Sequence, residues 1–189
     1  MNLAPMAGPP SKPRVLVVDD HEANRYAFES VLERDFEVVL AASGKQALEI
    51  CEQRDFAVIV LDVRMPEMDG FETAETLRRR PNTSVTPIIF TSAYDQTLKQ
   101  MTRGYVSGAT DFLFSPVDAD LLRLKVRTYA QIHLRHEALR HDVEKLNEAI
   151  LALHAELARR GIDVTKVKVR MDTLEEMAKD LSRQAAREP

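Results

Sequence analysis

Acidic and hydroxyl side chains follow four short apolar runs of this sequence, each at the point where a run ends. The residues that share this position are Asp19, Asp20, Asp62, Thr91 and Ser115. Three carboxylates in one crevice repel one another unless a cation lies between them, and hard oxygen ligands suit Mg²⁺ or Mn²⁺. A hydroxyl beside them can hydrogen-bond an oxyanion. These residue types therefore indicate a site where a phosphoryl group is held against a metal ion.

The elements that must position these side chains alternate between strands and helices. Five apolar runs lie at 14–18, 36–42, 56–61, 87–90 and 110–114, and the first has no polar alternation, as in a strand buried on both faces of a parallel sheet. Helical segments separate them, which predicts βαβ units and helices on both faces of the sheet. The carboxyl ends of parallel strands meet at one edge, where open α/β sheets carry their sites.

The predicted helices have apolar positions at helical spacing. In the first, from about 21 to 34, these are Ala23, Tyr26, Ala27, Ser30 and Val31, and in the second they are Ala47, Leu48 and Cys51. A single Asp or Ser after a strand is most often a helix cap or turn residue, and Asp20 or Ser43 alone could be read so. The coincidence of Asp19, Asp20, Asp62 and Thr91 at matching strand ends favours a site.

Four segments resemble the receiver domain of two-component response regulators. They are Val-Leu-Val-Val-Asp-Asp at 15–20, Leu-Asp-Val-Arg-Met-Pro-Glu-Met-Asp-Gly at 61–70, Ile-Ile-Phe-Thr-Ser-Ala at 88–93 and Gly-Ala-Thr-Asp-Phe-Leu-Phe-Ser-Pro-Val-Asp at 108–118. The resemblance covers about residues 13–130. It implies an α/β fold, flavodoxin-like (CheY-like), with a doubly wound five-stranded parallel sheet in the order 2-1-3-4-5.

The resemblance also implies a role for each site residue. Asp62 would accept a phosphoryl group from a histidine kinase or phosphotransfer protein. Mg²⁺ would be held by Asp20, Asp62 and the backbone carbonyl of Arg64, with Asp19 acting through water. Thr91 would bind the phosphoryl oxygens, and Phe112 would be the rotating aromatic of a switch, with a place in the plain core as its other interpretation.

Ser115 departs from the family, which has a lysine at this position before the proline. An ammonium there would pair with the phosphoryl group, whereas a hydroxyl can hydrogen-bond but brings no charge. Phosphoryl transfer remains chemically plausible because the acceptor and the metal carboxylates are present. The departure puts in question the coupling from phosphate to switch. Arg64 is a candidate substitute cation, with a solvated loop arginine as the equal alternative.

The C-terminal part has a heptad repeat over 129–181. One core position holds Tyr129, His136, Val143, Ile150, Leu157, Val164, Met171 and Ala178, and the other holds Ile132, Leu139, Leu146, Leu153, Arg160, Val167, Leu174 and Leu181. This pattern favours a parallel two-stranded coiled coil and hence a homodimer through 129–181. The competing interpretation is an antiparallel hairpin bent near Gly161. We expect a flexible leader at 1–13, a receiver at 14–128, the coil at 129–182 and a tail at 183–189.

Composition limits the functional classes. The chain has 189 residues, one cysteine and a formal net charge of −4, so neither a disulfide framework nor a nucleic-acid footprint is expected. With no spanning segment or secretory signal recognised, we expect a cytoplasmic protein without membrane or direct DNA binding. No output-enzyme signature is present, so we expect no enzyme. Three functions compete: a phosphorylation-responsive receiver with a dimeric coil, a phosphate-independent dimeric scaffold, and the N-terminal part of a larger receiver–coil–output enzyme.

Overall fold

The computed structural model describes residues 12–92, 98–161 and 177. Five strands form one parallel sheet in the order β2-β1-β3-β4-β5, as predicted. The strands are β1 (Arg14–Val18), β2 (Glu37–Ala41), β3 (Val58–Asp62), β4 (Ile88–Ser92) and β5 (Asp111–Phe114). The helices are α1 (Glu22–Leu32), α2 (Gly44–Gln53), α3 (Gly70–Arg78), α4 (Leu98–Val106) and α5 (Ala119–Arg159).

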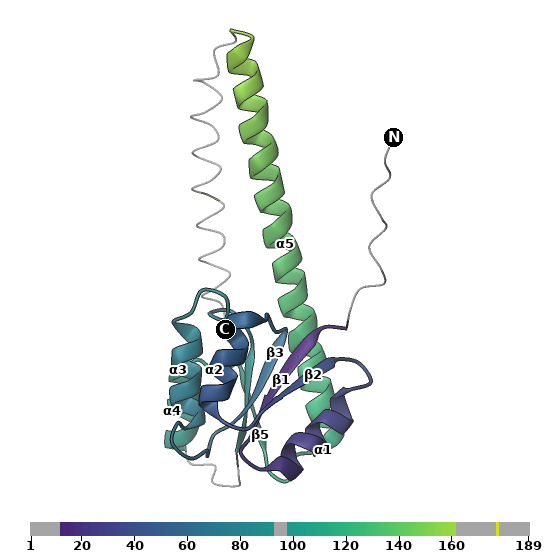
Figure 1. The fold of residues 1–189 in the computed structure, drawn as a ribbon, viewed down its shortest axis with the longest axis vertical. Coiled ribbons are helices and arrows are strands. Elements are labelled where there is room, and N and C mark those ends of the chain that lie inside the picture. The colour runs from purple at the N-terminus through teal and green to yellow at the C-terminus, as the bar shows by residue number, and fades with distance from the viewer. Residues whose placement is uncertain (1–11, 93–97, 162–176, 178–189) are drawn as a thin grey trace. The chain divides into compact units, whose positions relative to one another are not determined.

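Helices cover both faces of the sheet (Figure 1). On one face the buried residues of β1 and β3 pack with α2 and α3, through side chains such as Ala47, Cys51 and Leu77. On the other face, Leu32 of α1 and Leu122 and Val126 of α5 complete a second cluster. Both faces of β1 and β3 are therefore buried, which explains why their sequences lack polar alternation.

The face that α1 turns to the sheet differs from the one that its spacing indicated. Leu32 is fully buried and Phe28 packs against the core, whereas Tyr26 is 55% exposed. The expected positions are exposed except for Val31: Ala23, Tyr26, Ala27 and Ser30. Small residues fit either face of a helix, so the large side chains Phe28 and Leu32 decide the face.

Side-chain caps begin three of the helices, α2, α3 and α5. Ser43 Oγ accepts a hydrogen bond from the Gln46 N–H at 3.2 Å, which makes Ser43 the N-cap of α2. Asp118 Oδ1 accepts from the Leu121 N–H at 2.8 Å at the start of α5. Asp20 has no such role, because the N-cap of α1 is His21 and it makes no side-chain cap bond. This leaves the Asp20 carboxylate available for another function.

The first turns of α5 are part of the receiver packing. Tyr129, which the heptad register assigned to the coil, is half-buried; its hydroxyl donates to Asp111 Oδ2 at 2.9 Å, and Ala130 is 2% exposed. The sheet lies in a compact unit that ends at Glu137, and a second unit begins at Ala138. The heptad repeat therefore begins on residues that also belong to the receiver core.

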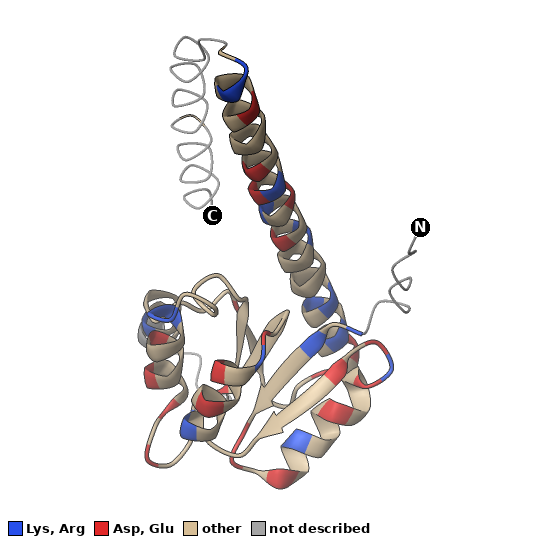
Figure 2. Ribbon diagram, turned by 45° about the horizontal axis from the view of Figure 1, so that its top comes forward, with Lys and Arg blue, Asp and Glu red and all other residues tan. Residues whose placement is uncertain are grey.

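Helix α5 ends at Arg159, and this differs from an unbroken helical rod through 181. Gly161 has φ 73°, a left-handed conformation that ends helices and that glycine adopts at little cost. The heptad positions at 164–181 lie outside the described residues. Acidic and basic residues are interspersed along α5 (Figure 2). Among the helices in the described part of the chain, none combines the length and apolar character that a bilayer crossing requires.

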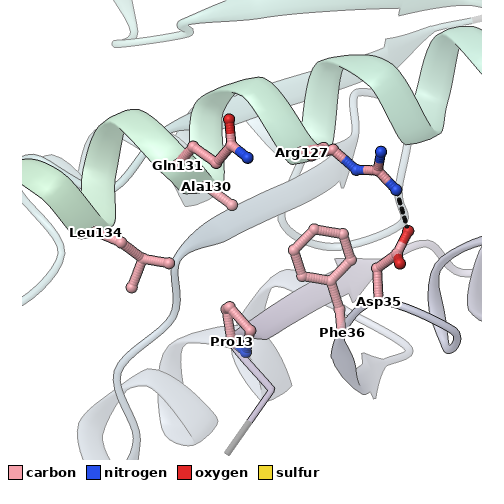
Figure 3. A pocket seen from close by; sticks show the side chains of 7 residues that line it. All are labelled: Pro13, Asp35, Phe36, Arg127, Ala130, Gln131 and Leu134. Carbon is pink, nitrogen blue, oxygen red and sulfur yellow. Dashed lines mark hydrogen bonds and ion pairs between the residues drawn. The ribbon is translucent and has the colours of Figure 1, made fainter. Parts of the chain in front are cut away.

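A small pocket of about 300 Å³ lies beneath α5 (Figure 3). Arg127 at its edge pairs with Asp35 at 2.7 Å, and Phe36 and Pro13 line it from the starts of β2 and β1. Pro13 and Phe36 precede their strands, whereas Asp19, Asp20 and Asp62 lie at the carboxyl ends of theirs. The pocket is therefore a feature of the opposite edge of the sheet.

Candidate functional site

The acidic residues meet at the carboxyl ends of β1 and β3, as the sequence predicted. Asp19 and Asp20 directly follow β1, and Asp62 is the last residue of β3. The carboxylates of Asp19 and Asp20 both act on the charge of Asp62. On the neighbouring strand, Thr91 is the register partner of Asp62. The fold thus brings together the four residues that the strand ends singled out.

Asp19 is buried and held in place by several donors. Its side chain is 3% exposed, Oδ1 accepts the His21 N–H at 2.8 Å, and Oδ2 accepts from Asn24 Nδ2 at 2.9 Å. The Arg25 guanidinium donates to the backbone carbonyl of Asp19 at 2.7 Å. Each carboxylate oxygen has a second lone pair, so Asp19 can still face a hydrated cation.

Burial and two like charges raise the pKa of Asp62 to about 6. Desolvation is the larger cause, and the carboxylates of Asp19 and Asp20 add to it. The backbone N–H groups of Val63 and Arg64 act in the opposite direction by donating to the carboxylate. Ionisation of Asp62 is therefore costly unless a cation lies nearby. A bound cation would remove this cost, so the arrangement favours cation binding.

The chain turns sharply behind Asp62. A Cβ at Gly70 would collide with the Asp62 carbonyl oxygen, so only glycine fits there. The Gly70 N–H donates to the Val63 carbonyl at 3.0 Å, and Asp69 caps α3 by accepting from Glu72 N–H. Glu67 in the same loop has φ 65° and pairs with Lys45 at 2.7 Å. These contacts fix the loop that carries Asp62 and Arg64.

Thr91 contributes a buried hydroxyl without a partner. The residue is 3% exposed, and among the described side chains its Oγ1 is the buried polar atom that lacks a hydrogen bond. An unsatisfied buried hydroxyl costs about 1–3 kcal/mol. Its position opposite Asp62 suits an external acceptor such as a phosphoryl oxygen. With the carboxylates, it makes the chemistry of this site fit a divalent cation and a phosphoryl group.

The other predicted site residues have more peripheral positions. Ser115 is exposed, and its backbone N–H donates to the Ser92 carbonyl at 2.8 Å. Arg64 is also exposed. Phe112 is 6% exposed, with its ring 5.5 Å from that of Phe90 and 5.2 Å from that of Tyr105. The buried ring of Phe112 is compatible with both interpretations, a switch and a core residue.

Sequence reasoning missed two residues of the site. His21 places Nδ1 2.9 Å from Asp20 Oδ1 and forms a possible ligand group with Asp19 and Asp20. Its only sequence signal is its place directly after the two aspartates. The missed role of Gly70 depends on a close approach to the Asp62 carbonyl, which the sequence does not reveal.

Comparisons with known proteins agree with this geometry. The family model for the response regulator receiver domain matches residues 15–127. A probable cyclic di-GMP phosphodiesterase of Vibrio cholerae is 32% identical over 145 residues, which is 77% of this chain and 33% of that protein. Response regulator PleD of Caulobacter vibrioides is 38% identical over 128 residues, 67% of this chain and 28% of that protein. The chain thus spans about a third of the length of these relatives.

Solved structures show the same fold. The receiver domain of the Francisella response regulator 1452 matches with a TM-score of 0.58 and 31% identity, over 63% of this chain and 97% of that one. Chemotaxis protein CheY4 of Vibrio cholerae matches with a TM-score of 0.60 and 30% identity, over 63% of this chain and 99% of that one. The chain therefore belongs to the response regulator receiver domain family of two-component systems.

Proposed function

We propose that this chain accepts a phosphoryl group on Asp62 from a phosphohistidine of a histidine kinase or phosphotransfer protein. The observation that carries the proposal is the pairing of Asp62 with Thr91, whose buried hydroxyl has no partner within the described residues. A phosphoryl group on Asp62 would supply acceptor oxygens at that point. Family membership supports the choice of donor.

The residues present suit Mg²⁺ as the metal ion. Asp20 and Asp62 would hold it together with the backbone carbonyl of Arg64, and Asp19 would support it through water. When bound, the ion would neutralise charge on the transferring group. The raised pKa of Asp62 supports this assignment, because the carboxylate gains most from a cation where its own charge is costly.

The chemical step uses Asp62 as the nucleophile. One carboxylate oxygen attacks phosphorus in line, the new P–O bond forms, and the P–N bond to the donor imidazole breaks. The departing imidazole keeps the electron pair of that bond. Thr91 Oγ would donate its hydrogen bond to a phosphoryl oxygen of the product.

We further propose that phosphorylation is signalled through α5 and a dimeric coil. Thr91 would move toward the phosphoryl group and leave space for Phe112 to turn. Phe112 adjoins α5, because Lys125 Nζ donates to its carbonyl at 3.0 Å. Apolar heptad side chains of α5 are 51–65% exposed in the single chain: Ile132, Leu139, Val143, Leu146 and Leu153. A second copy of the chain would bury this stripe.

The direct test is incubation of the full chain with acetyl phosphate and Mg²⁺, followed by intact mass measurement. We expect a gain of one phosphoryl group that is lost in Asp62→Asn and kept in Asp55→Asn, a matched exposed aspartate. Persistence of the gain in Asp62→Asn would place the acceptor elsewhere. No gain with any small-molecule donor or phosphohistidine protein would overturn the proposal.

A second candidate is a dimeric scaffold that does not respond to phosphate, and Ser115 favours it. The family lysine would bring a charge that the exposed serine lacks. In this case phosphorylation of Asp62 would leave the dimer and α5 unchanged. Restoring the amine with Ser115→Lys should then create or strengthen a phosphate-dependent change in amide exchange along α5. Equal responses of the wild type and Ser115→Lys would show that the serine is not a defect.

A third candidate places this receiver in a longer protein with an output enzyme. The observation that favours it is the share of the two curated relatives that the chain spans, 33% and 28%. In that arrangement the coil would connect the receiver to the output segment. The test is to fuse the chain to a reporter enzyme that is inactive as a monomer and active as a dimer. Reporter activity is then compared with and without acetyl phosphate. No dependence on phosphate would count against it.

A further inference from the structure

An imidazole lies beside the two carboxylates that follow β1. His21 Nδ1 is 2.9 Å from Asp20 Oδ1 and 3.6 Å from Asp19 Oδ1. One ligand atom from each of these residues lies within 4.8 Å of the other two. The His21 side chain is 71% exposed, so it is accessible to ions from solvent. The resemblance to receivers assigns roles to the two carboxylates and none to His21.

The spacing of these atoms matches the coordination shell of a metal ion. With metal–ligand bonds of about 2.1 Å, neighbouring ligand atoms in an octahedral shell are about 3 Å apart. The Nδ1–Asp20 separation of 2.9 Å agrees with this value, and 3.6 Å to Asp19 requires only a small side-chain rotation. A cation bound here would be shared by Nδ1 and the Asp20 carboxylate, in place of the direct contact between them.

Hydrogen bonds already hold one of the three groups, the Asp19 carboxylate. The His21 N–H donates to Asp19 Oδ1 at 2.8 Å, and Asn24 holds the other oxygen of Asp19 at 2.9 Å. An independent observation also points to a ligand in this crevice: Thr91 Oγ1 is buried, has no partner, and lies opposite Asp62, whose charge Asp19 and Asp20 influence. A cation binding here would find one of its ligands, Asp19, already held in place.

We propose that His21 Nδ1 is a nitrogen ligand of the cation site at Asp19 and Asp20, and that it adds affinity for first-row transition ions but not for Mg²⁺. Imidazole suits Zn²⁺, Ni²⁺ and Cu²⁺, whereas Mg²⁺ takes oxygen ligands and keeps several waters. The ligand group with His21 does not include Asp62. A transition ion would thus be held at the Asp19–Asp20 side, and Mg²⁺ between Asp20 and Asp62.

This inference rests on the proposed function in using the same carboxylates, and it has a consequence for regulation. Both ions need Asp20, so they exclude each other. Zn²⁺ bound through His21 would lower phosphorylation of Asp62 by displacing Mg²⁺. The site would then report on the balance of divalent ions as well as on the phosphoryl donor.

The test is calorimetric titration of the full chain with Zn²⁺ and, separately, with Mg²⁺, in the wild type and His21→Ala. We expect His21→Ala to weaken Zn²⁺ binding at the site by tenfold or more, and Mg²⁺ binding by less than about twofold. His21 makes no side-chain cap bond, so alanine removes the imidazole and keeps the backbone N–H. His141→Ala, an exposed histidine of α5, is the matched control and should not weaken the site.

A residue-resolved measurement separates this site from the other histidines. In ¹⁵N-histidine spectra of the wild type, Zn²⁺ should shift the Nδ1 resonance of His21. In Asp20→Asn, the same addition of Zn²⁺ should leave that resonance in place. Equal losses of Zn²⁺ and Mg²⁺ affinity in His21→Ala, no loss of either, or an unmoved His21 resonance would each overturn the inference. Failure of the wild type to be phosphorylated would contradict the proposed function and leave the Zn²⁺ result standing.

Discussion

Asp62 and Thr91 are register partners on adjacent parallel strands, and the Thr91 hydroxyl is buried there without a hydrogen bond. One strand thus ends in a carboxylate whose charge is costly, and the next carries an unsatisfied donor. Both costs fall when a phosphoryl group and a cation bind. The unliganded site is therefore strained in a way that its proposed ligands relieve.

The raised pKa of Asp62 predicts a pH-dependent stability difference. Because the folded protein binds this proton more tightly than the unfolded chain, the contribution of Asp62 to folding stability is fully present below about pH 4 and is lost as pH rises through 6. In EDTA, Asp62→Asn should exceed the wild type in unfolding free energy by about 1 kcal/mol above pH 7, allowing for solvent screening. The difference should vanish near pH 4. Urea unfolding at several pH values measures it, with Asp55→Asn as the control; a constant difference across pH would contradict it.

Removing the Thr91 hydroxyl should not lower the stability of the protein. Thr91→Val keeps the shape and deletes the unsatisfied donor, so the unfolding free energy should stay equal or rise by up to about 1 kcal/mol. Thr83→Val is the matched control, because Thr83 Oγ1 is buried and donates to the Leu77 carbonyl at 2.7 Å. That variant should lose about 1–2 kcal/mol. A large loss in Thr91→Val would show that its hydroxyl already has a partner.

The hydroxyl of Tyr129 should stabilise the start of α5 against β5. It donates to Asp111 Oδ2 at 2.9 Å, next to Lys125 Nζ at 2.7 Å from the same oxygen. Burial and the Asp111 carboxylate raise the pKa of Tyr129 to about 12. Tyr129→Phe should lower the unfolding free energy by about 1 kcal/mol and remove a transition near pH 12 from the alkaline absorbance titration. Tyr26→Phe, at a 55% exposed position, should leave the unfolding free energy unchanged.

The role of the heptad stripe in dimerisation can be tested with two leucines of similar exposure. Leu139 is 65% exposed on the predicted coil stripe, and Leu151 is 63% exposed away from it. If the coil is the main dimer interface, Leu139→Asn should raise the dimer dissociation constant tenfold or more, which is about 1.4 kcal/mol. Sedimentation equilibrium should show no change for Leu151→Asn. Equal effects of the two substitutions would place the interface elsewhere.

The sequence by itself determined the sheet and the acidic end of its site. The uninterrupted apolar runs of β1 and β3 require burial on both faces, and that requirement predicts a parallel sheet whose strand ends converge. Asp19, Asp20, Asp62 and Thr91 follow from their places at those ends. The family resemblance supplied the strand order and the roles, because neither depends on local pattern alone.

Tertiary structure alone decided the features that depend on contacts across the chain. Phe28 and Leu32, not Tyr26, became the buried side of α1, because the sheet accepts the larger apolar surface. Tyr129 joined the receiver through Asp111, a partner eighteen positions earlier. Gly70 came against the carbonyl oxygen of Asp62 through the loop after β3. Periodicity describes one element at a time, whereas these contacts depend on how two elements meet.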